Sequence, residues 1–301
     1  MTVHAARLLL LLAPLLLAGC GWFRRPLPET AAQPRYVVGP AYQAGTVWFY
    51  PREDFHLDAT GLAIVLPDRS GLTANGEALD SSAMAGAHAT LQLPAIARVT
   101  NLETGLQALI RINDRGPASP GRLLGLTRHA ADRLGVTPGA VTRVRVQVVD
   151  GPSQALRDSL HGSAGLVVAL APRGKVTSEA LAPPPGLQSS ARVRRVVAAM
   201  PASATDTPVV VVPARLADDA VQVPAGFGRL WIRAGDFGQA GYANQLRARL
   251  SRLGAMVERM RQGRSDTFRV RAGPYANVAQ ADAALDQALR AGVTDARIVV
   301  E

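Results

Sequence analysis

The segment 227–301 contains one pattern of strand, helix and strand twice, and this duplication constrains the fold more than any other feature of the sequence. Each half begins with an apolar strand that leads into a turn of glycine, one further residue and an aromatic ring. Two βαβ halves of this kind predict a ferredoxin-like βαββαβ sheet with helices on one face. The two turns are Ala234-Gly235-Asp236-Phe237 and Ala272-Gly273-Pro274-Tyr275.

The spacing of apolar residues in this segment predicts where its strands and helices begin and end. Four strands are predicted, over 230–234, 255–260, 268–272 and 296–300. Two helices are predicted, over 241–253 and 278–291. The side chains expected to face the core are Tyr242, Leu246, Leu250 and Leu253 in the first helix, and Ala281, Leu285 and Leu289 in the second.

A second compact region, 41–150, is predicted to be rich in β-strands. Apolar and polar residues alternate over 97–102, 108–113 and 142–149, and the last of these places Val144, Val146 and Val148 on one face. One helix is predicted from Thr127, a candidate N-cap, to Leu134, with Gly135 ending it. Many short strands joined by turns that contain glycine or proline predict a small barrel.

Two linkers lie on either side of the β-rich region 41–150. Residues 20–40 are rich in proline, arginine and alanine, as in a tether. Residues 151–226 contain Pro183-Pro184-Pro185 and lack a sustained period, which predicts a mostly disordered linker, although the run Val209–Val212 could add a short strand. The predicted domains are therefore 1–19 (signal peptide), 20–40 (tether), 41–150 (barrel), 151–226 (linker) and 227–301 (C-terminal domain).

The N-terminus predicts export from the cytoplasm. Arg7 precedes the apolar run Leu8–Leu17, which is too short to span a membrane but has the length of a signal peptide. The run ends in Leu17-Ala18-Gly19-Cys20, a lipobox in which Cys20 would carry the lipid; the alternative is a simple secretory signal that contains a cysteine. Gly21 favours sorting to an outer membrane. Cys20 is the only cysteine, so an internal disulfide is excluded.

The charge of the chain suits an acidic partner. Its formal net charge is +10 and its pI is about 10.9, which would fit nucleic acid, an anionic lipid surface or an acidic polymer. Lys175 is the only lysine, and such a bias towards arginine equally suggests a GC-rich genome. Because no dense basic run with interleaved aromatic residues is present, nucleic acid is not a predicted partner.

Polar residues are densest in three stretches of the predicted barrel. Three acids and one imidazole there would suffice for general acid–base chemistry on a glycosidic bond. Other interpretations remain open: Asn75-Gly76 could be a hairpin turn, Asp114-Arg115 a loop with a local ion pair, and His88 a structural hydrogen-bonding residue. The stretches are Thr73-Ala74-Asn75-Gly76-Glu77-Ala78-Leu79-Asp80, His88, and Asn113-Asp114-Arg115-Gly116-Pro117.

These stretches, with Gly121-Arg122-Leu123, resemble the double-psi β-barrel of the rare lipoprotein A family, and 231–300 resembles a sporulation-related repeat (SPOR) domain. The lipobox, barrel, proline-rich linker and SPOR domain follow in the family's order, so the resemblance covers nearly the whole chain. It implies a lytic transglycosylase that cleaves peptide-free (denuded) peptidoglycan strands, on which the SPOR domain docks. With the lipobox and Gly21, it further predicts a lipid-anchored protein of the cell envelope, on the periplasmic face of the outer membrane and enriched at the division septum. A monomer is the default expectation. Divisome proteins are candidate partners.

The resemblance assigns the family's functional acids and imidazole to Glu77, Asp80, His88 and Asp114. Asp114 would protonate the glycosidic oxygen and then accept the proton of the muramic acid 6-hydroxyl as the 1,6-anhydro ring closes. Glu77 would stabilise positive charge on the sugar, and His88 and Asp80 would orient the acids or the substrate. Asn75 and Arg115 are candidate substrate-binding residues. No metal or other cofactor is implied.

In the SPOR domain, the candidates for a glycan groove are aromatic rings that stack on sugars and arginines that bind hydroxyls and carboxylates. The alternative for both aromatic residues is that they only pack the edge of the sheet. The candidates are Arg233, Phe237, Tyr275, and Arg271 or Arg269.

Two departures from the family pattern leave alternatives open. Where the family has Ser-Trp-Tyr-Gly, this chain has Val47-Trp48-Phe49-Tyr50, followed by an insertion through about residue 70 that could form a lid or, more simply, a surface loop. Where the family has an acid, this chain has Gly125. The runner-up functions are therefore a wall-binding module without catalysis and a septal scaffold with an inert barrel.

Overall fold

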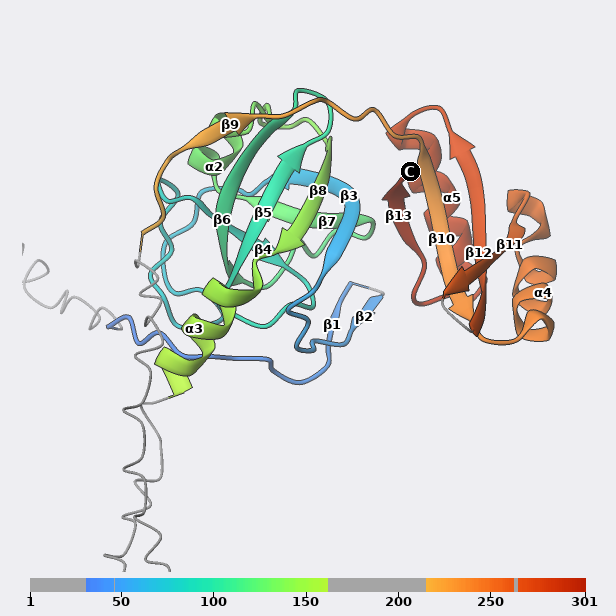
Figure 1. The fold of residues 1–301 in the computed structure, drawn as a ribbon, viewed down its shortest axis with the longest axis horizontal. Helices are drawn as coiled ribbons and strands as arrows, with labels where there is room; N and C mark the ends of the chain where they lie inside the picture. The colour runs from blue at the N-terminus through green and yellow to red at the C-terminus, as the bar shows by residue number, and fades with distance from the viewer. Residues whose placement is uncertain (1–30, 46, 162–214, 263–264) are drawn as a thin grey trace, which may run out of the picture.

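The computed structural model describes residues 31–45, 47–161, 215–262 and 265–301 (Figure 1). It consists of a closed β-barrel followed by a separate sheet with two helices. The predicted signal peptide, the lipobox with Cys20 and the predicted strand at 209–212 lie outside the described residues. None of the described helices is both long enough and apolar enough to cross a membrane.

The barrel closes through six strands. In the order β4-β7-β3-β8-β5-β6 each strand pairs with the next, and β6 pairs back with β4. The pairs β3–β7 and β4–β6 are parallel, and the others are antiparallel. This closed barrel confirms the predicted double-psi-like architecture. Its strands are β3 (Asp58–Val65), β4 (Ala85–His88), β5 (Ala95–Asn101), β6 (Leu106–Asp114), β7 (Arg122–Leu126) and β8 (Thr142–Val148).

The barrel core is formed by alternate apolar residues of these strands, as the sequence pattern predicts. Val144 and Val146 are fully buried, whereas Val148 at the end of β8 is only half-buried. Helix α2 (Arg128–Arg133) begins after Thr127, whose side chain accepts the N–H of Ala130 as an N-cap. The predicted strands and helix of this region are confirmed.

The interpretation of 51–70 as an insertion outside the barrel is wrong for its central part. Residues 58–65 form β3, which pairs with β7 on one side and β8 on the other, and its Leu62 and Ala63 are fully buried. Val47–Phe49, which had been compared with the family's aromatic segment, instead forms β2 of a hairpin with β1 (Tyr42–Ala44). The strand was not predicted because β3 lies between two other strands of the barrel and therefore lacks a simple alternation between apolar and polar residues.

The predicted absence of regular structure in 151–226 is wrong at both ends. Helix α3 (Asp150–His161) docks on the barrel, where Ser153 exchanges hydrogen bonds with the backbone of Ile96. Strand β9 (Ala220–Gln222) pairs with β6. Both were missed because few side chains are buried: over residues 150–160 of α3 only Ser153 and Leu156 are deeply buried, and β9 is exposed along its length.

The C-terminal domain has the predicted βαββαβ order. Its antiparallel sheet runs β11-β12-β10-β13, with α4 and α5 packed on one face. Tyr242 was placed on the buried side of the first helix, but it is exposed, because Ala243, Leu246 and Leu250 form the apolar stripe. The elements are β10 (Leu230–Phe237), α4 (Ala240–Arg249), a 3₁₀ turn (Ser251–Leu253), β11 (Met256–Gln262), β12 (Ser265–Tyr275), α5 (Val278–Arg290) and β13 (Arg297–Val300).

The two predicted Gly-x-aromatic turns are the ends of strands. Gly235 and Phe237 lie within β10, and Gly273 and Tyr275 lie within β12. Register shifts interrupt the pairing of β10 beside Gly235, and both glycines have a positive φ. The duplication therefore marks β-bulges rather than turns.

The two domains contact one another along β3 and β13. Thr60 Oγ1 donates a hydrogen bond to the carbonyl of Val300 (2.7 Å) and accepts the Val300 N–H (3.0 Å). Arg122 forms two parallel hydrogen bonds of 2.8 Å with Asp282 on α5. These contacts place one edge of the C-terminal sheet against the barrel.

Candidate functional site

Glu77 lies at the centre of a largely buried polar cluster on the face of β6 that points away from the barrel core. The guanidinium of Arg111 on β6 donates to both of its carboxylate oxygens, with a shortest distance of 2.7 Å. The side-chain amides of Asn113 and Asn75 donate at 2.9 and 2.8 Å. Burial alone would raise the pKa of Glu77, but the hydrogen bonds and charge of Arg111 and the two amides hold it below its ordinary value. Glu77 is therefore an ionised carboxylate that cannot serve as the proton donor.

Asp114 lies at the end of β6, close to the surface. Its Oδ1 accepts the backbone N–H groups of Ala74 (2.9 Å) and Arg115 (2.8 Å), and its Oδ2 accepts a hydrogen bond from Arg69 (3.0 Å). The Asp114 side chain is 13% exposed, and that of Arg69, which covers it, is 49% exposed. A ligand that displaces Arg69 would reach one oxygen of Asp114 while the backbone still holds the other.

His88 is buried at the end of β4. Its Nδ1 accepts the backbone N–H groups of Thr90 and Leu91, both at 3.2 Å, so the proton of the neutral ring is on Nε2. Nε2 is buried and has no hydrogen-bond partner in the described structure. Burial, together with the charges of Arg115 and Arg52, lowers the pKa of His88 to about 4. The ring is therefore a neutral N–H donor at neutral pH.

The depressed pKa of His88 predicts an acid-sensitive fold. Above pH 6.5 the ring is neutral in the folded and in the unfolded chain. As the pH falls towards 4, His88 is protonated in the unfolded chain but stays neutral in the folded chain. The free energy of unfolding should fall by roughly 3 kcal/mol across this window. Urea unfolding at several pH values measures it.

In the variant His88→Gln this part of the pH dependence should disappear. The variant His56→Gln, which changes an exposed histidine, serves as the control and should keep it. If the free energy of unfolding of His88→Gln still falls by the same amount as the pH is lowered, another group is responsible.

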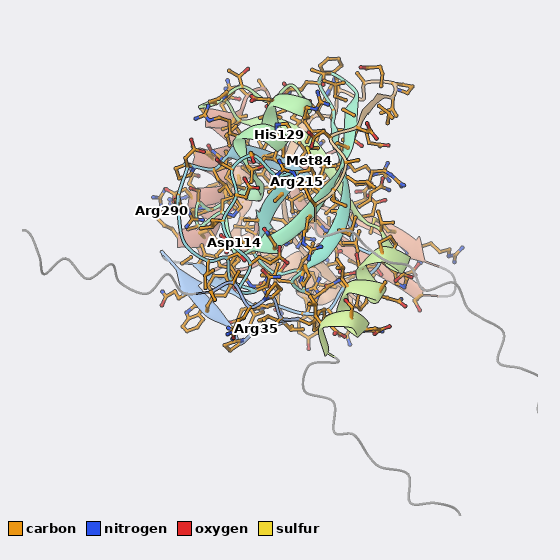
Figure 2. All side chains as sticks on the ribbon, turned by 90° about the vertical axis from the view of Figure 1, so that its left-hand side faces the viewer. Arg35, Met84, Asp114, His129, Arg215 and Arg290 are labelled. Carbon is orange, nitrogen blue, oxygen red and sulfur yellow. The ribbon has the colours of Figure 1, made fainter. Side chains whose placement is uncertain are left out.

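Asp80 is not part of the cluster around Glu77. It accepts hydrogen bonds from the backbone and hydroxyl of Ser82 (2.8 and 2.6 Å) and forms an ion pair with Arg215 (3.5 Å). The Ser82 hydrogen bonds hold its pKa below the ordinary value. Figure 2 shows Asp114 apart from Arg215 on this face of the barrel. Asp80 and Arg69 both line a small cleft of about 30 Å³. Arg69 in turn binds Asp114, so the link between Asp80 and Asp114 runs through the Arg69 side chain.

The two predicted substrate-binding residues of the barrel have structural contacts. Asn75 is fully buried and bonds to Thr73 and Glu77. The guanidinium of Arg115 donates to the carbonyls of Val38 (2.5 Å) and Leu91, and burial lowers its pKa. Asn75 thus holds the Glu77 carboxylate, and Arg115 connects the end of β6 to the segments around Val38 and Leu91.

The predicted glycan residues of the C-terminal domain divide between its core and its open face. Phe237 and Tyr275 are half-buried and pack against the domain core. On the open face, Arg271 stacks over the ring of Trp231, with 4.3 Å between guanidinium carbon and ring centroid, and pairs with Glu258 and Glu301. Arg269 pairs with Asp236 and Glu301, and Arg233 with Asp236. Of the predicted glycan residues, only Arg233 lines a large cleft that lies between the two domains.

The sequence analysis missed the partners that hold the acids. Arg111 and Asn113 bind Glu77, and Arg69 binds Asp114. A signal for the first two was present, because Arg111 and Asn113 alternate with the fully buried Ile110 and Ile112 in a strand where polar residues are not expected. The position of Arg69 gave no such signal.

The position of the missing family acid, Gly125, is occupied by a neighbouring side chain. A Cβ at Gly125 would lie 2.6 Å from Cδ2 of Leu66 and 2.8 Å from its Cγ. Gly125→Asp should therefore lower the free energy of unfolding by about 1–3 kcal/mol, and Leu66→Ala in the same chain should restore part of the loss. Urea unfolding tests this against Gly241→Asp, where a Cβ meets no atom within 4 Å. Equal effects at both glycines would contradict the steric explanation.

The described residues contain no group of three or more His, Cys, Asp or Glu side chains placed to hold a metal ion. The buried cluster instead pairs one carboxylate with a guanidinium and two amides, which leaves that carboxylate without a free oxygen for a ligand.

Comparison with known families matches both domains. Residues 46–148 match the family described as lytic transglycolase (DPBB_1), and residues 226–298 match the SPOR domain. Barrel and sheet thus define a class, a double-psi barrel of the lytic transglycosylase type joined to a SPOR domain. Both matches agree with the resemblance of the chain to the rare lipoprotein A (RlpA) family.

Several curated relatives carry the name endolytic peptidoglycan transglycosylase RlpA. The protein of Pseudomonas aeruginosa is 29% identical over 83% of this chain and 72% of its own length. That of Yersinia pestis is 44% identical over 27% of this chain and 22% of its own, and that of Escherichia coli is 37% identical over 41% and 33%. The chain thus spans a third or less of the last two relatives. The crystal structure of the P. aeruginosa RlpA SPOR domain is 21% identical over 24% of this chain and 99% of its own, with a TM-score of 0.23.

Proposed function

We propose that this protein is a lytic transglycosylase that cleaves peptide-free peptidoglycan strands and leaves 1,6-anhydro-muramic acid ends. The observation that carries the proposal is the setting of Asp114. It is a carboxylate close to the barrel surface: two backbone N–H groups bind its Oδ1, and the half-exposed side chain of Arg69 covers its Oδ2. The family matches and the names of the relatives support the same reaction.

In the proposed reaction Asp114, protonated in the substrate complex, transfers its proton to the glycosidic oxygen as the bond from that oxygen to C1 of muramic acid breaks. The 6-hydroxyl oxygen of the same sugar then bonds to C1, and Asp114 accepts its proton. The carboxyl group returns to its starting state, and no water is consumed. For this step the sugar has to displace Arg69 from Oδ2.

The other polar residues have supporting roles in this proposal. Glu77 is ionised, and its charge would favour positive charge at C1 of the sugar. Its two oxygens are already engaged, so it would also position the segment whose Ala74 N–H holds Asp114. His88, with its proton on Nε2, would donate a hydrogen bond that orients the substrate or one of the acids. Asp80 would affect the reaction only indirectly, through Arg69, which lines the same small cleft.

We further propose that Cys20 carries a lipid that anchors the protein to the periplasmic face of the outer membrane, and that the SPOR domain docks on denuded strands at the septum. Phe237, Tyr275, Arg233 and Arg271 remain its candidate contacts. Divisome partners and a monomeric state belong to the same proposal. The sequence features and the SPOR match support it.

A second function, peptidoglycan binding without cleavage, is favoured by one observation. Leu66 fills the space of the family's missing acid at Gly125, so this barrel has one carboxylate fewer near its site. The two functions separate when the full chain is incubated with sacculi treated with an amidase. Cleavage releases soluble anhydro-ended fragments, whereas a binding module pellets with intact strands. Sacculi that retain their stem peptides serve as the comparison and should release little.

A further inference from the structure

A cleft of about 990 Å³ lies between the two domains, away from the carboxylates of the proposed site. Neither Asp114 nor Glu77 lines it, but His88, Ala89 and Thr90 do. Its barrel wall includes β2 and Tyr50, which follows it; Figure 1 shows the hairpin β1–β2 between the barrel and the C-terminal sheet. Its other wall comes from β10, β13 and the residues before β13.

Three exposed aromatic rings line this cleft. Trp48 is 47%, Tyr50 59% and Phe227 74% exposed. Trp48 and Tyr50 lie on the same side of the chain because they are two residues apart in an extended segment, while Phe49 between them is half-buried. Such rings offer flat apolar faces of the kind that stack on sugar rings.

The hairpin that carries these rings is fixed to the loop after His88. The Tyr42 hydroxyl donates to the carbonyl of Ala89 (2.9 Å), and the backbone N–H of Arg52 donates to the carbonyl of Thr90 (2.9 Å). The Tyr42 ring stacks on Phe49, with centroids 5.4 Å apart. The aromatic faces are therefore positioned before a ligand arrives, which lowers the entropic cost of binding.

Arg297 is the unpaired cation of the cleft. Arg52, Arg122, Arg145 and Arg233 also line it, and each forms an ion pair: with Asp54, Asp282, Asp58 and Asp236, respectively. Within the described ranges, the Arg297 side chain has neither an ion-pair nor a hydrogen-bond partner, and its backbone lies opposite Arg233 on the neighbouring strand. Partial burial lowers the pKa of Arg297, and the charge of Arg233 lowers it further. A bound anion would relieve both effects.

We propose that this cleft binds a stretch of peptide-free glycan whose rings stack on Trp48, Tyr50 and Phe227, and that Arg297 binds a sugar carboxylate. One unpaired cation beside three aromatic faces suits a polymer with sparse carboxylates. A polyphosphate chain would require several free cations instead. Asp295, which also lines the cleft and forms no ion pair in the described residues, would accept hydrogen bonds from sugar hydroxyls. Both domains would then hold one strand alongside the loop of His88. The inference rests on the proposed function for its choice of ligand.

Isothermal titration of the full chain with two tetrasaccharides of equal length tests this inference. One is a denuded peptidoglycan fragment with lactyl carboxylates, and the other is chitotetraose, which has none. The wild-type chain should bind the first about tenfold more tightly. Arg297→Gln should remove this preference and leave chitotetraose binding unchanged. The double variant Trp48→Ala, Tyr50→Ala should bind both ligands about tenfold more weakly. Arg247→Gln, which removes the same charge from α4 on the far side of the domain, is the matched control and should bind as wild type.

An Arg297→Gln variant that keeps the preference for the carboxylate ligand would overturn the inference. Failure of the proposed function gives a different result, because the titrations are carried out with Asp114→Asn present in every chain, so that the ligand is bound but not cleaved. If the wild type releases anhydro products while the cleft variants retain wild-type KM and Kd, the cleft inference fails alone. If the wild type binds as described and releases no anhydro product, the proposed cleavage fails alone.

Discussion

Arg111→Leu is expected to lower the free energy of unfolding by about 3–5 kcal/mol, because it leaves the largely buried Glu77 carboxylate without its cationic partner. Arg111 is buried and supplies the only positive charge that contacts Glu77 among the described residues. Without it, the carboxylate would remain buried with two amide donors. An uncompensated buried charge is much more costly than the loss of an exposed pair.

Urea unfolding of the full chain measures this effect, and Arg145→Leu provides the matched control. Arg145 also makes two hydrogen bonds to a carboxylate, that of Asp58, but this pair is close to half exposed. Its loss should cost less than about 1 kcal/mol. Replacing Glu77 and Arg111 together by apolar residues should recover part of the stability, because no buried charge then lacks a partner. Equal costs for the two arginine variants would contradict the role of the buried pair.

Asp114→Asn is expected to reduce the formation of anhydro ends by at least about a thousandfold while the fold is retained. The amide oxygen of asparagine can still accept the N–H groups of Ala74 and Arg115, so the loop should keep its position. The amide cannot transfer a proton to the glycosidic oxygen. Binding of peptide-free strands should therefore change little, and the loss should fall on kcat.

The matched control for this variant is Asp68→Asn. Asp68 lies beside Arg69, is half exposed and pairs with Arg128 rather than with the proposed site. The same chemical change at this position should alter the rate less than about twofold, as expected for an exposed ion pair. Comparable losses in both variants would point to a general effect of charge on this loop.

Much of the fold could be predicted from the sequence because most elements have one buried face. The period of two marks β5, β6 and β8, and the period of 3.6 marks α5, whose Ala281 and Leu285 are buried as predicted. Thr127 and Gly135 identify the ends of α2. Strand β3 was mistaken for an insertion because it is enclosed by β7 and β8, and α3 was missed because it touches the barrel with only two deeply buried residues.

The candidate site could be predicted only as residue types. The density of polar residues indicated Glu77, His88 and Asp114, and the family resemblance supplied their roles, but no pattern along the chain indicates that Arg111 contacts Glu77. This contact depends on the pairing of β4 with β6 and on the path of residues 73–77, which are tertiary features. The same applies to the interdomain cleft, since Trp48 and Arg297 are brought to one place only when β13 meets β3.

The central claim is that Asp114 carries out non-hydrolytic cleavage of peptide-free strands. The most direct measurement is mass spectrometry of the soluble products after amidase-treated sacculi are incubated with wild-type, Asp114→Asn and Asp68→Asn proteins. The account predicts fragments ending in 1,6-anhydro-muramic acid from the wild type and Asp68→Asn, and none above background from Asp114→Asn. Intact strands with the wild-type protein bound to them, or anhydro fragments in undiminished amount from Asp114→Asn, would contradict it.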